Sequence, residues 1–143
     1  MHIRALSLAV TIAVQFAPVA AKAIDLFSAD QAIVHFGHTL YERHCANCHG
    51  ADATGSTADT GKETIKAPDL TGIAKKNGGS LPLWETYEVV SGNKVVAEHR
   101  TRAMPIWSRE LAKAPGINQE NAESIVRGRI LAILAYLSTI QEK

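Results

Sequence analysis

Five consecutive residues, Cys45-Ala46-Asn47-Cys48-His49, constrain this chain more than any other feature of its sequence. They form the pattern C-x-x-C-H, in which two thiols lie three residues apart and a histidine follows directly. Thiols at this spacing can reach the two vinyl groups of one porphyrin and form thioethers, and the adjacent imidazole can then meet the iron. We therefore predict one covalently bound haem, attached through Cys45 and Cys48, with His49 as the proximal iron ligand.

The same two cysteines allow other interpretations, and the rest of the sequence argues against each. A disulfide between them would close a loop of a few residues, and loop entropy gives such a bridge little stabilising effect. A thioredoxin-type redox motif belongs in a βαβ unit, whereas the surrounding pattern indicates helix and loop. A zinc site needs two further ligands at finger-like spacing, but the chain has 2 cysteines in all and no H-x₃₋₅-H pair after them.

The N-terminal stretch has the pattern of a secretory signal peptide. Residues 1–4 are short and positively charged, residues 5–17 are almost wholly apolar, and Ala21 and Ala23 are the small residues that a signal peptidase reads. An uncleaved membrane anchor is the alternative, but a span needs about 20 apolar residues, and the apolar run over residues 5–17 is shorter. We therefore expect a leader over residues 1–23, export to the periplasm, and a mature chain that begins near Ile24 without a membrane span.

The mature chain, residues 24–143, has a length of about 120 residues, which suits a single domain with one core. The whole sequence carries 15 basic and 14 acidic side chains. Removing the leader takes away Arg4 and Lys22 and no acidic residue, which leaves 13 basic and 14 acidic residues and a net charge of −1. This balance gives no general affinity for nucleic acid or anionic membranes, so neither is an expected partner.

Helical periodicity and helix-boundary signals predict an all-α fold, with helices over residues 30–44, 70–76, 82–91 and 118–141. Asp30 and Asn118 are the expected caps of the first and last helices. Residues 51–68 are predicted to form a long loop, and residues 93–107 a connecting segment. No strand alternation stands out. The expected apolar faces are Ile33, Phe36, Leu40 and Tyr41 on the first helix, and Ile125, Ile130, Ile133, Leu134 and Leu137 on the last.

Rapid electron transfer favours a sixth ligand on the iron, and Met104 is the main candidate. It is the only methionine of the expected mature chain, it lies on an irregular segment, and Pro105 directly after it stiffens the backbone. The alternatives are that Met104 fills a gap in the core, or that His99 is the ligand instead. The remaining histidines, His35, His38 and His44, are expected to be surface or packing residues.

Beyond the C-x-x-C-H pattern, the chain resembles the class I c-type cytochromes, in particular the bacterial mono-haem members. Gly37 and Tyr41 precede the first cysteine by eight and four residues, as in that family's N-terminal helix, where the glycine allows close contact with the C-terminal helix. Ile133 and Tyr136-Leu137 resemble the apolar and aromatic partners on that last helix. The resemblance covers residues 29–141 and implies a cytochrome c-like fold, with helices and loops packed around one haem c and its iron.

Two further positions of the resemblance concern the iron ligands. Pro68 resembles the family's proline whose carbonyl accepts the Nδ1–H of the haem-ligating histidine, which would orient His49 and raise its basicity. Met104-Pro105, with Trp107 nearby, resembles the segment that carries the distal methionine ligand. Residues 51–66 and 93–102 do not align with a minimal member of the family.

Ligation by His49 and Met104 implies a low-spin haem of fairly high potential, because a thioether stabilises ferrous iron better than a second imidazole. No pair of carboxylates and no Ser/His/Asp set stands out, so we expect an electron carrier rather than an enzyme. Three forms stay open: a diffusing periplasmic carrier, a cytochrome subunit of a periplasmic dehydrogenase, and a haem protein with an open iron that binds small ligands or peroxide. The expected partners are redox proteins, either a dehydrogenase or an oxidase or reductase.

Basic residues fall in the two segments that are expected to border the haem edge. A rim of such charges would steer an acidic redox partner at low salt, while solvated surface charges are the alternative interpretation. Neutralisation of a haem propionate by one of the two arginines is a further role that the sequence leaves open. The five residues of this basic rim are Lys75, Lys76, Lys94, Arg100 and Arg102.

Overall fold

The computed structural model describes residues 31–59, 64–94 and 104–142. Six helices and two short strands lie in these ranges: α1 (Gln31–His44), α2 (Ala46–His49), β1 (Thr57–Asp59), β2 (Thr64–Lys66), α3 (Ile73–Lys76), α4 (Leu83–Ser91), α5 (Trp107–Ala112) and α6 (Ala122–Thr139). None of the described helices is long and apolar enough to cross a membrane. The expected leader, the Asp30 cap, His99, Arg100 and Arg102 lie outside the described residues.

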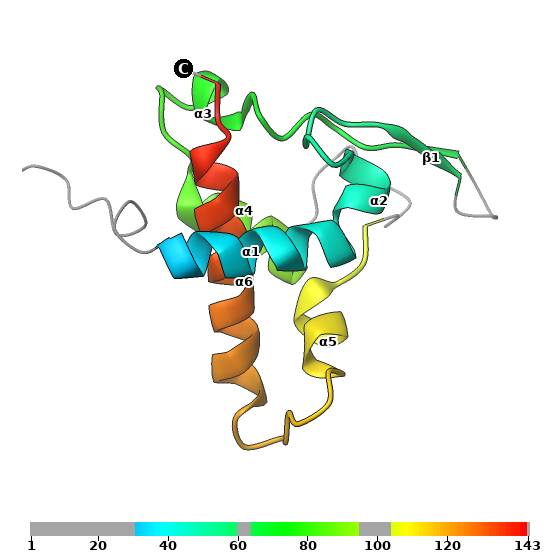
Figure 1. Ribbon diagram of the computed structural model, residues 1–143, viewed down its shortest axis with the longest axis vertical. Helices are drawn as coiled ribbons and strands as arrows, with labels where there is room; N and C mark the ends of the chain where they lie inside the picture. Colours follow the sequence, from blue (N-terminus) through cyan, green and yellow to red (C-terminus); the bar gives the residue numbers. More distant parts are fainter. Residues whose placement is uncertain (1–30, 60–63, 95–103, 143) are drawn as a thin grey trace, which may run out of the picture.

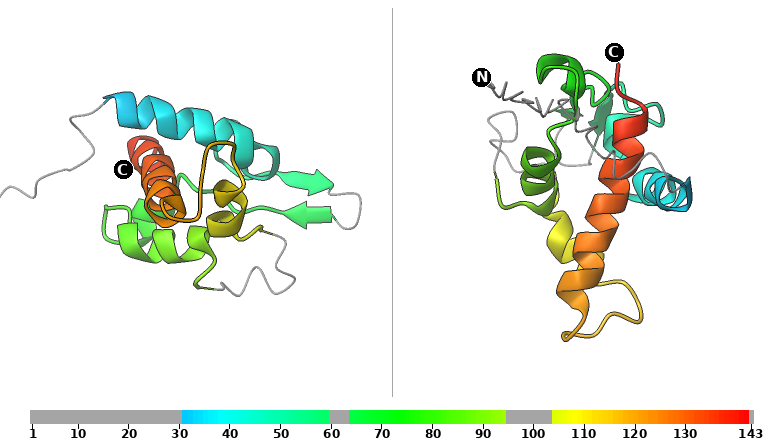
Figure 2. Two further views of the ribbon diagram at one scale, coloured as in Figure 1. Left: turned by 90° about the horizontal axis from the view of Figure 1, so that it is seen from below. Right: turned by 90° about the vertical axis from the view of Figure 1, so that its left-hand side faces the viewer.

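The first and last helices cross each other at the centre of the molecule. Figure 1 shows α1 lying across α6, and in Figure 2 α1 and α4 lie on opposite sides of α6. A Cβ atom on Gly37 would overlap the carbonyl group of Ala132 on α6. Any larger residue would therefore push the two helices apart, which confirms the expected role of Gly37 in helix packing.

The core is built around α6, whose buried side chains extend over more than one face: Val126, Ile130, Ala132, Ile133, Leu134, Ala135 and Leu137. Leu40 and Tyr41 of α1 belong to the same cluster. Ile125 is only half-buried, and its neighbour Val126 is buried in its place.

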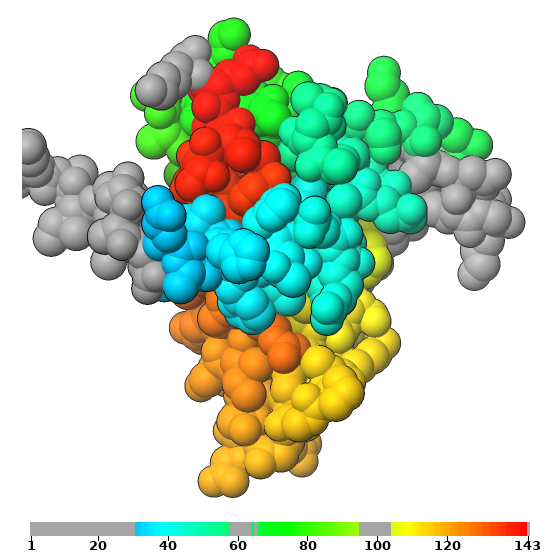
Figure 3. All heavy atoms as spheres, in the orientation of Figure 1, coloured from blue at the N-terminus to red at the C-terminus, as the bar shows by residue number. Residues whose placement is uncertain are grey.

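Two residues of the expected apolar face on α1 are not in the core. Ile33 and Phe36 are 38% and 47% exposed, respectively. Ile33 is exposed because a helix that crosses its neighbour is covered only near the crossing point, whereas Phe36 directly precedes Gly37 and projects from a different side of the helix than the one that meets α6. The space-filling view shows α1 over the middle of α6 and its N-terminal turns extending beyond it (Figure 3). The buried residues of α1 are accordingly Gly37, Leu40 and Tyr41.

The segment predicted as a long loop contains a β-hairpin. Strands β1 and β2 pair antiparallel, with Thr57 opposite Lys66 and Asp59 opposite Thr64. The hairpin projects away from the helices in Figure 1. The sequence did not predict these strands, because three-residue strands are too short to produce a recognisable apolar alternation. The described fold is otherwise helical.

The helix boundaries differ from the predictions where asparagine or aspartate side chains form turns. The Asn118 side chain accepts the Asn121 N–H at 3.0 Å, the Asn121 side chain accepts the Asn118 N–H at 3.1 Å, and α6 begins only after Asn121. Asn118 thus makes the capping-box pair with Asn121 that was expected of a cap, but it does so on the turn before the helix, and Asn121 occupies the N-cap position of α6 itself. Likewise, α3 begins at Ile73 because the Asp69 carboxylate accepts the Thr71 N–H at 2.7 Å and holds a turn there. Helix α5 was not predicted at all.

Candidate functional site

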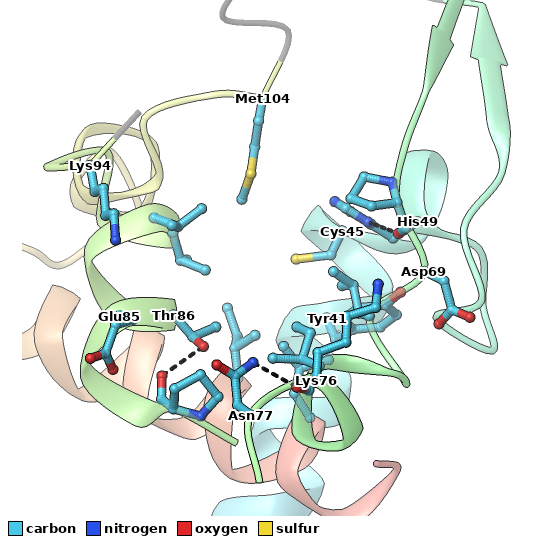
Figure 4. Close-up of a pocket in the computed structure, with 18 residues that line it drawn as sticks. Tyr41, Cys45, His49, Asp69, Lys76, Asn77, Glu85, Thr86, Lys94 and Met104 are labelled. Atoms are coloured by element: carbon cyan, nitrogen blue, oxygen red, sulfur yellow. Dashed lines mark hydrogen bonds between the residues drawn. The ribbon is translucent and has the colours of Figure 1, made fainter. Parts of the chain in front are cut away.

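A cavity of about 440 Å³ is lined by Cys45, which directly follows α1, and by Met104, which lies shortly before α5. Its volume falls within the range of ligand and cofactor pockets, about 300–1,000 Å³. Figure 4 shows the Cys45 thiol and the Met104 thioether pointing into it from different sides, with His49 on the side of Cys45. Apolar side chains from the 68–76 segment, α4 and α6 form much of the remaining wall: Leu70, Ile73, Val89, Val90, Ile133 and Leu137.

Cys45 and His49 reach the cavity because the chain turns directly after α1. Cys45 precedes the single-turn helix α2, and its carbonyl accepts hydrogen bonds from the backbone N–H groups of Cys48 at 3.1 Å and His49 at 2.9 Å. Cys45 and His49 are lining residues, whereas Cys48 lies between them on α2, half-buried, and does not line the cavity. The sequence motif is thus folded as one compact turn at the edge of the cavity.

The imidazole of His49 is buried and hydrogen-bonded to the backbone. Its Nδ1 lies 3.0 Å from the carbonyl oxygen of Pro68. A carbonyl can only accept, so Nδ1 donates and carries the ring proton, and the Nε2 lone pair can act as a ligand. The contact expected from the family resemblance is present.

The Pro68 carbonyl is itself held in place by the loop that follows α2. The backbone N–H of Ala67 donates to Ser56 O at 2.9 Å, and the N–H of Leu70 donates to Ala53 O at 2.8 Å. Gly55 has φ +87°, and a Cβ atom there would lie 2.7 Å from the Ala67 carbonyl oxygen, so this close approach requires glycine.

The same loop is also bonded to the turn that carries the motif. The Ser56 hydroxyl donates to Cys48 O at 2.7 Å, and Gly55 N–H donates to His49 O at 2.9 Å. Neither Gly55 nor Ser56 was predicted from the sequence as a residue of the site. The only signal for them was the unusual length of the predicted loop over residues 51–68, and no motif distinguishes Gly55 or Ser56 from other loop residues.

Met104 is half-buried and is positioned by the start of α5. The Ser108 hydroxyl donates to Ser91 O at the end of α4, at 2.7 Å. The rings of Trp107 and His44 meet edge to face, with centroids 5.3 Å apart. These contacts connect the start of α5, which follows Met104, to α4 and to the end of α1. The part of the cavity lined by Met104 is therefore connected to the part lined by Cys45.

Tyr41 links the core to the turn that carries the motif. Its hydroxyl donates to Gly50 O at 2.7 Å, and its ring packs against Tyr136 of α6 with centroids 5.2 Å apart. Burial, and to a lesser extent the neighbouring Cys45, raises the pKa of Tyr41 above its ordinary value. The phenol therefore stays protonated and acts as a donor. This pairing is the aromatic contact expected between the first and last helices.

The comparisons with known proteins agree with this geometry. The sequence model of the Cytochrome c family matches residues 34–140. The chain belongs to the cytochrome c family. It is 34% identical over 87 residues to the Cbb3-type cytochrome c oxidase subunit CcoP of Azospirillum brasilense. That match covers 61% of this cytochrome and 26% of the relative, so the chain spans about a quarter of that protein. No solved structure matches it.

The residues of the cavity fit the cofactor of this family, haem c with its iron. A thiol, an imidazole and a thioether line one space that has apolar walls, which suits attachment, axial ligation and contact with porphyrin faces. Burial, with a smaller contribution from Cys48, raises the pKa of Cys45 to about 12. A thioredoxin-type cysteine needs a lowered pKa, so the structure argues against that alternative. Among the described residues, no group of three or more His, Cys, Asp and Glu is arranged to hold a metal such as zinc.

The other described histidines lie away from the cavity in this cytochrome. His35 is exposed on α1, and His38 packs against Tyr136 with its Nε2 3.6 Å from the carboxylate of Glu42. His44 contacts Trp107, and its pKa is lowered by burial and by the nearby Arg43 and Arg129. These placements agree with the expected packing and surface roles.

The basic rim is only partly described. Lys76 and Lys94 line the cavity, together with the acidic residues Glu85 and Asp69. Lys75 does not line it, and its ammonium lies 3.5 Å from the Glu142 carboxylate. The described part of the rim is therefore narrower than the sequence suggested, with Lys76 and Lys94 as the two cations beside the cavity.

Proposed function

We propose that this cytochrome is an exported periplasmic carrier of single electrons, with a haem attached to Cys45 and Cys48 and its iron ligated by His49 and Met104. The electron-transfer role follows from family membership, whereas the compartment and the ligands are the proposal. The observation that carries it is the shared cavity, into which His49 and Met104 are brought from segments 55 residues apart in sequence.

Haem c supplies a single site that accepts and releases one electron without a change in covalent bonding. The chain's own residues prepare that site. The Pro68 carbonyl, by accepting the Nδ1–H, orients His49 and raises the basicity of its Nε2. The thioether of Met104 favours the ferrous state and so raises the potential. The apolar side chains Val89, Val90, Ile133 and Leu137 of α4 and α6 would cover part of the bound haem and reduce its contact with water.

The partners of this carrier are proposed to be other redox proteins, either a periplasmic dehydrogenase or an oxidase or reductase. The match to an oxidase subunit supports a second version, in which the chain is the cytochrome subunit of a larger complex. In both versions this chain passes electrons, and the chemistry on a substrate is done by its partner. The alternative of an open iron is disfavoured because the Met104 side chain points into the cavity.

Ligand binding to the reduced wild-type protein tests this function. Iron with both axial positions occupied has no vacant site, so the ferrous protein should exchange electrons rapidly with a redox mediator and bind carbon monoxide only slowly and weakly. Stopped-flow absorbance follows both reactions. Rapid, tight carbon monoxide binding by the unmodified protein would instead support the ligand-binding or peroxidase form.

A further inference from the structure

One wall of the cavity is held by hydrogen bonds at both of its ends. We call residues 68–76 the wall segment, because Pro68, Leu70, Ile73 and Lys76 within it line the cavity. Its first part is held by the loop after α2, as described above. Its second part is held by the C-terminal residues that follow α6, which Figure 1 shows beside α3.

A single side chain, that of Gln141, makes most of the second attachment. Its Nε2 donates to Leu70 O and to Leu137 O, each at 2.9 Å. Its Oε1 accepts the backbone N–H of Ala74 at 2.8 Å. The Ala74 N–H belongs to the first turn of α3, where a helix offers no internal acceptor. The amide of Gln141 therefore connects the end of α6 to both halves of the wall segment.

The neighbouring contacts at this place depend less on side-chain identity. Glu142 donates its backbone N–H to Thr71 O at 2.9 Å, a bond that survives any substitution except proline. The ion pair between Lys75 and Glu142 is exposed, and such pairs contribute little to stability. Of the contacts between the C-terminal residues and the wall segment, those of the Gln141 side chain are therefore the ones that a substitution can remove with the largest effect.

We infer that Gln141 is a positioning residue for the iron ligand: by holding the wall segment, it keeps the Pro68 carbonyl against Nδ1 of His49. The inference rests on the proposed function, in which His49 binds the iron. Leu70 lies two residues after Pro68 and is held through its N–H by Ala53 and through its carbonyl by Gln141, so loss of the Gln141 bond removes one of the two hydrogen bonds that hold the chain next to the acceptor of the histidine. The strength of the Nδ1–H bond, and with it the basicity of the ligand, depends on a residue near the C-terminus.

The substitution Gln141→Glu removes the donor of the amide, Nε2, and keeps an acceptor in place of Oε1. A glutamate keeps an acceptor for the Ala74 N–H but, once ionised, has no donor for the Leu70 and Leu137 carbonyls. When it is protonated, its O–H can donate to one of them. The matched control is Glu142→Gln, which removes the neighbouring ion pair and leaves the Gln141 amide intact.

The readout is solvent exchange of the His49 Nδ1–H proton, measured by NMR on the ferrous haem-loaded protein and expressed as a ratio to wild type at each pH. At neutral pH the ratio for Gln141→Glu should rise by about five- to tenfold, the effect of losing the one hydrogen bond that Gln141 donates to the wall segment, at Leu70 O. It should fall toward one in acid, where the new carboxyl is protonated. The charged neighbours Lys75, Lys76, Asp69 and Glu142 are common to both proteins and cancel in the ratio.

Two backbone amides make this result specific. The Ala74 N–H should keep its protection in Gln141→Glu, because its acceptor remains, and lose it in Gln141→Ala. The Ile130 N–H, in the middle of α6, reports global opening and should not change in any variant. A ratio that stays at one, that is independent of pH, or that rises equally in Glu142→Gln overturns the inference. If the wild-type His49 ring lacks resonances shifted by the haem, the proposed ligation is wrong as well.

Discussion

The Pro68 carbonyl determines which ring nitrogen of His49 carries the proton. By fixing the proton on Nδ1 it leaves the Nε2 lone pair for the proposed ligation, and this contact, which the family resemblance implied, is present in the structure at 3.0 Å. The residues that hold Pro68, namely Gly55, Ser56 and Gln141, were not predicted. Their roles depend on backbone contacts between distant segments, and such contacts leave no pattern of spacing in one sequence.

Replacement of Met104 tests the sixth ligand at the residue scale. Met104→Ala should abolish the weak near-infrared sulfur-to-iron charge-transfer band of the ferric protein and lower its reduction potential, because the thioether that stabilises ferrous iron is gone. Absorption spectroscopy and potentiometry measure these changes. His99→Ala is the control and should leave both unchanged. Loss of the low-spin spectrum in His99→Ala, with an unaltered Met104→Ala, would mean that the ligand has been assigned wrongly.

At the scale of elements, the four predicted helices are all present, and their positions follow from periodicity and turn residues. The ends of α4 illustrate this, since Pro82 precedes the helix and Gly92, with φ +88°, ends it. The hairpin and α5 were missed because each is short and gains its order from neighbours. Ile33 and Phe36 were assigned to the core because periodicity shows which residues share a face but not where another helix covers it.

The crossing of α1 and α6 predicts opposite effects for two glycine substitutions. Gly37→Ala places a methyl group against the Ala132 carbonyl and should lower the free energy of unfolding by about 1–3 kcal/mol, the usual cost of overpacking. Gly128→Ala, in α6, meets nothing within 4 Å and should raise it by about 0.5–1 kcal/mol through helix propensity. Urea unfolding of the haem-loaded variants measures both. Equal effects of the two substitutions would show that Gly37 is not a packing residue.

At the scale of the whole molecule, the cavity gathers residues from α1, α4, α6 and the segments between them, and the sequence predicted its chemical core of Cys45, His49 and Met104. It did not predict which charges lie beside the cavity, since that depends on how loops fold over it. Lys75 was assigned to the basic rim but pairs with Glu142, whereas Lys76 and Lys94 line the cavity.

The basic rim predicts salt-dependent association with an acidic redox partner. The second-order rate of electron transfer should fall as ionic strength rises to 0.1 M, where the Debye length is about 10 Å. Lys76→Gln and Lys94→Gln should each lower the rate at low salt by a few-fold. Lys113→Gln, which removes an equal charge from the exposed pair with Glu110, should have a smaller effect. Stopped-flow kinetics measure these rates, and a rate independent of salt would eliminate the rim while leaving the carrier function intact.

The central claim is that Cys45 and Cys48 bind the haem covalently, and extraction of the exported protein with acidified acetone tests it most directly. Two thioethers should keep the haem on the precipitated wild-type chain, where a pyridine haemochrome spectrum and the mass of the peptide containing both cysteines detect it. Cys45→Ala and Cys48→Ala should reduce the attachment, and His49→Ala should impair maturation. Release of the haem into the acetone phase from correctly exported wild-type protein would contradict this account.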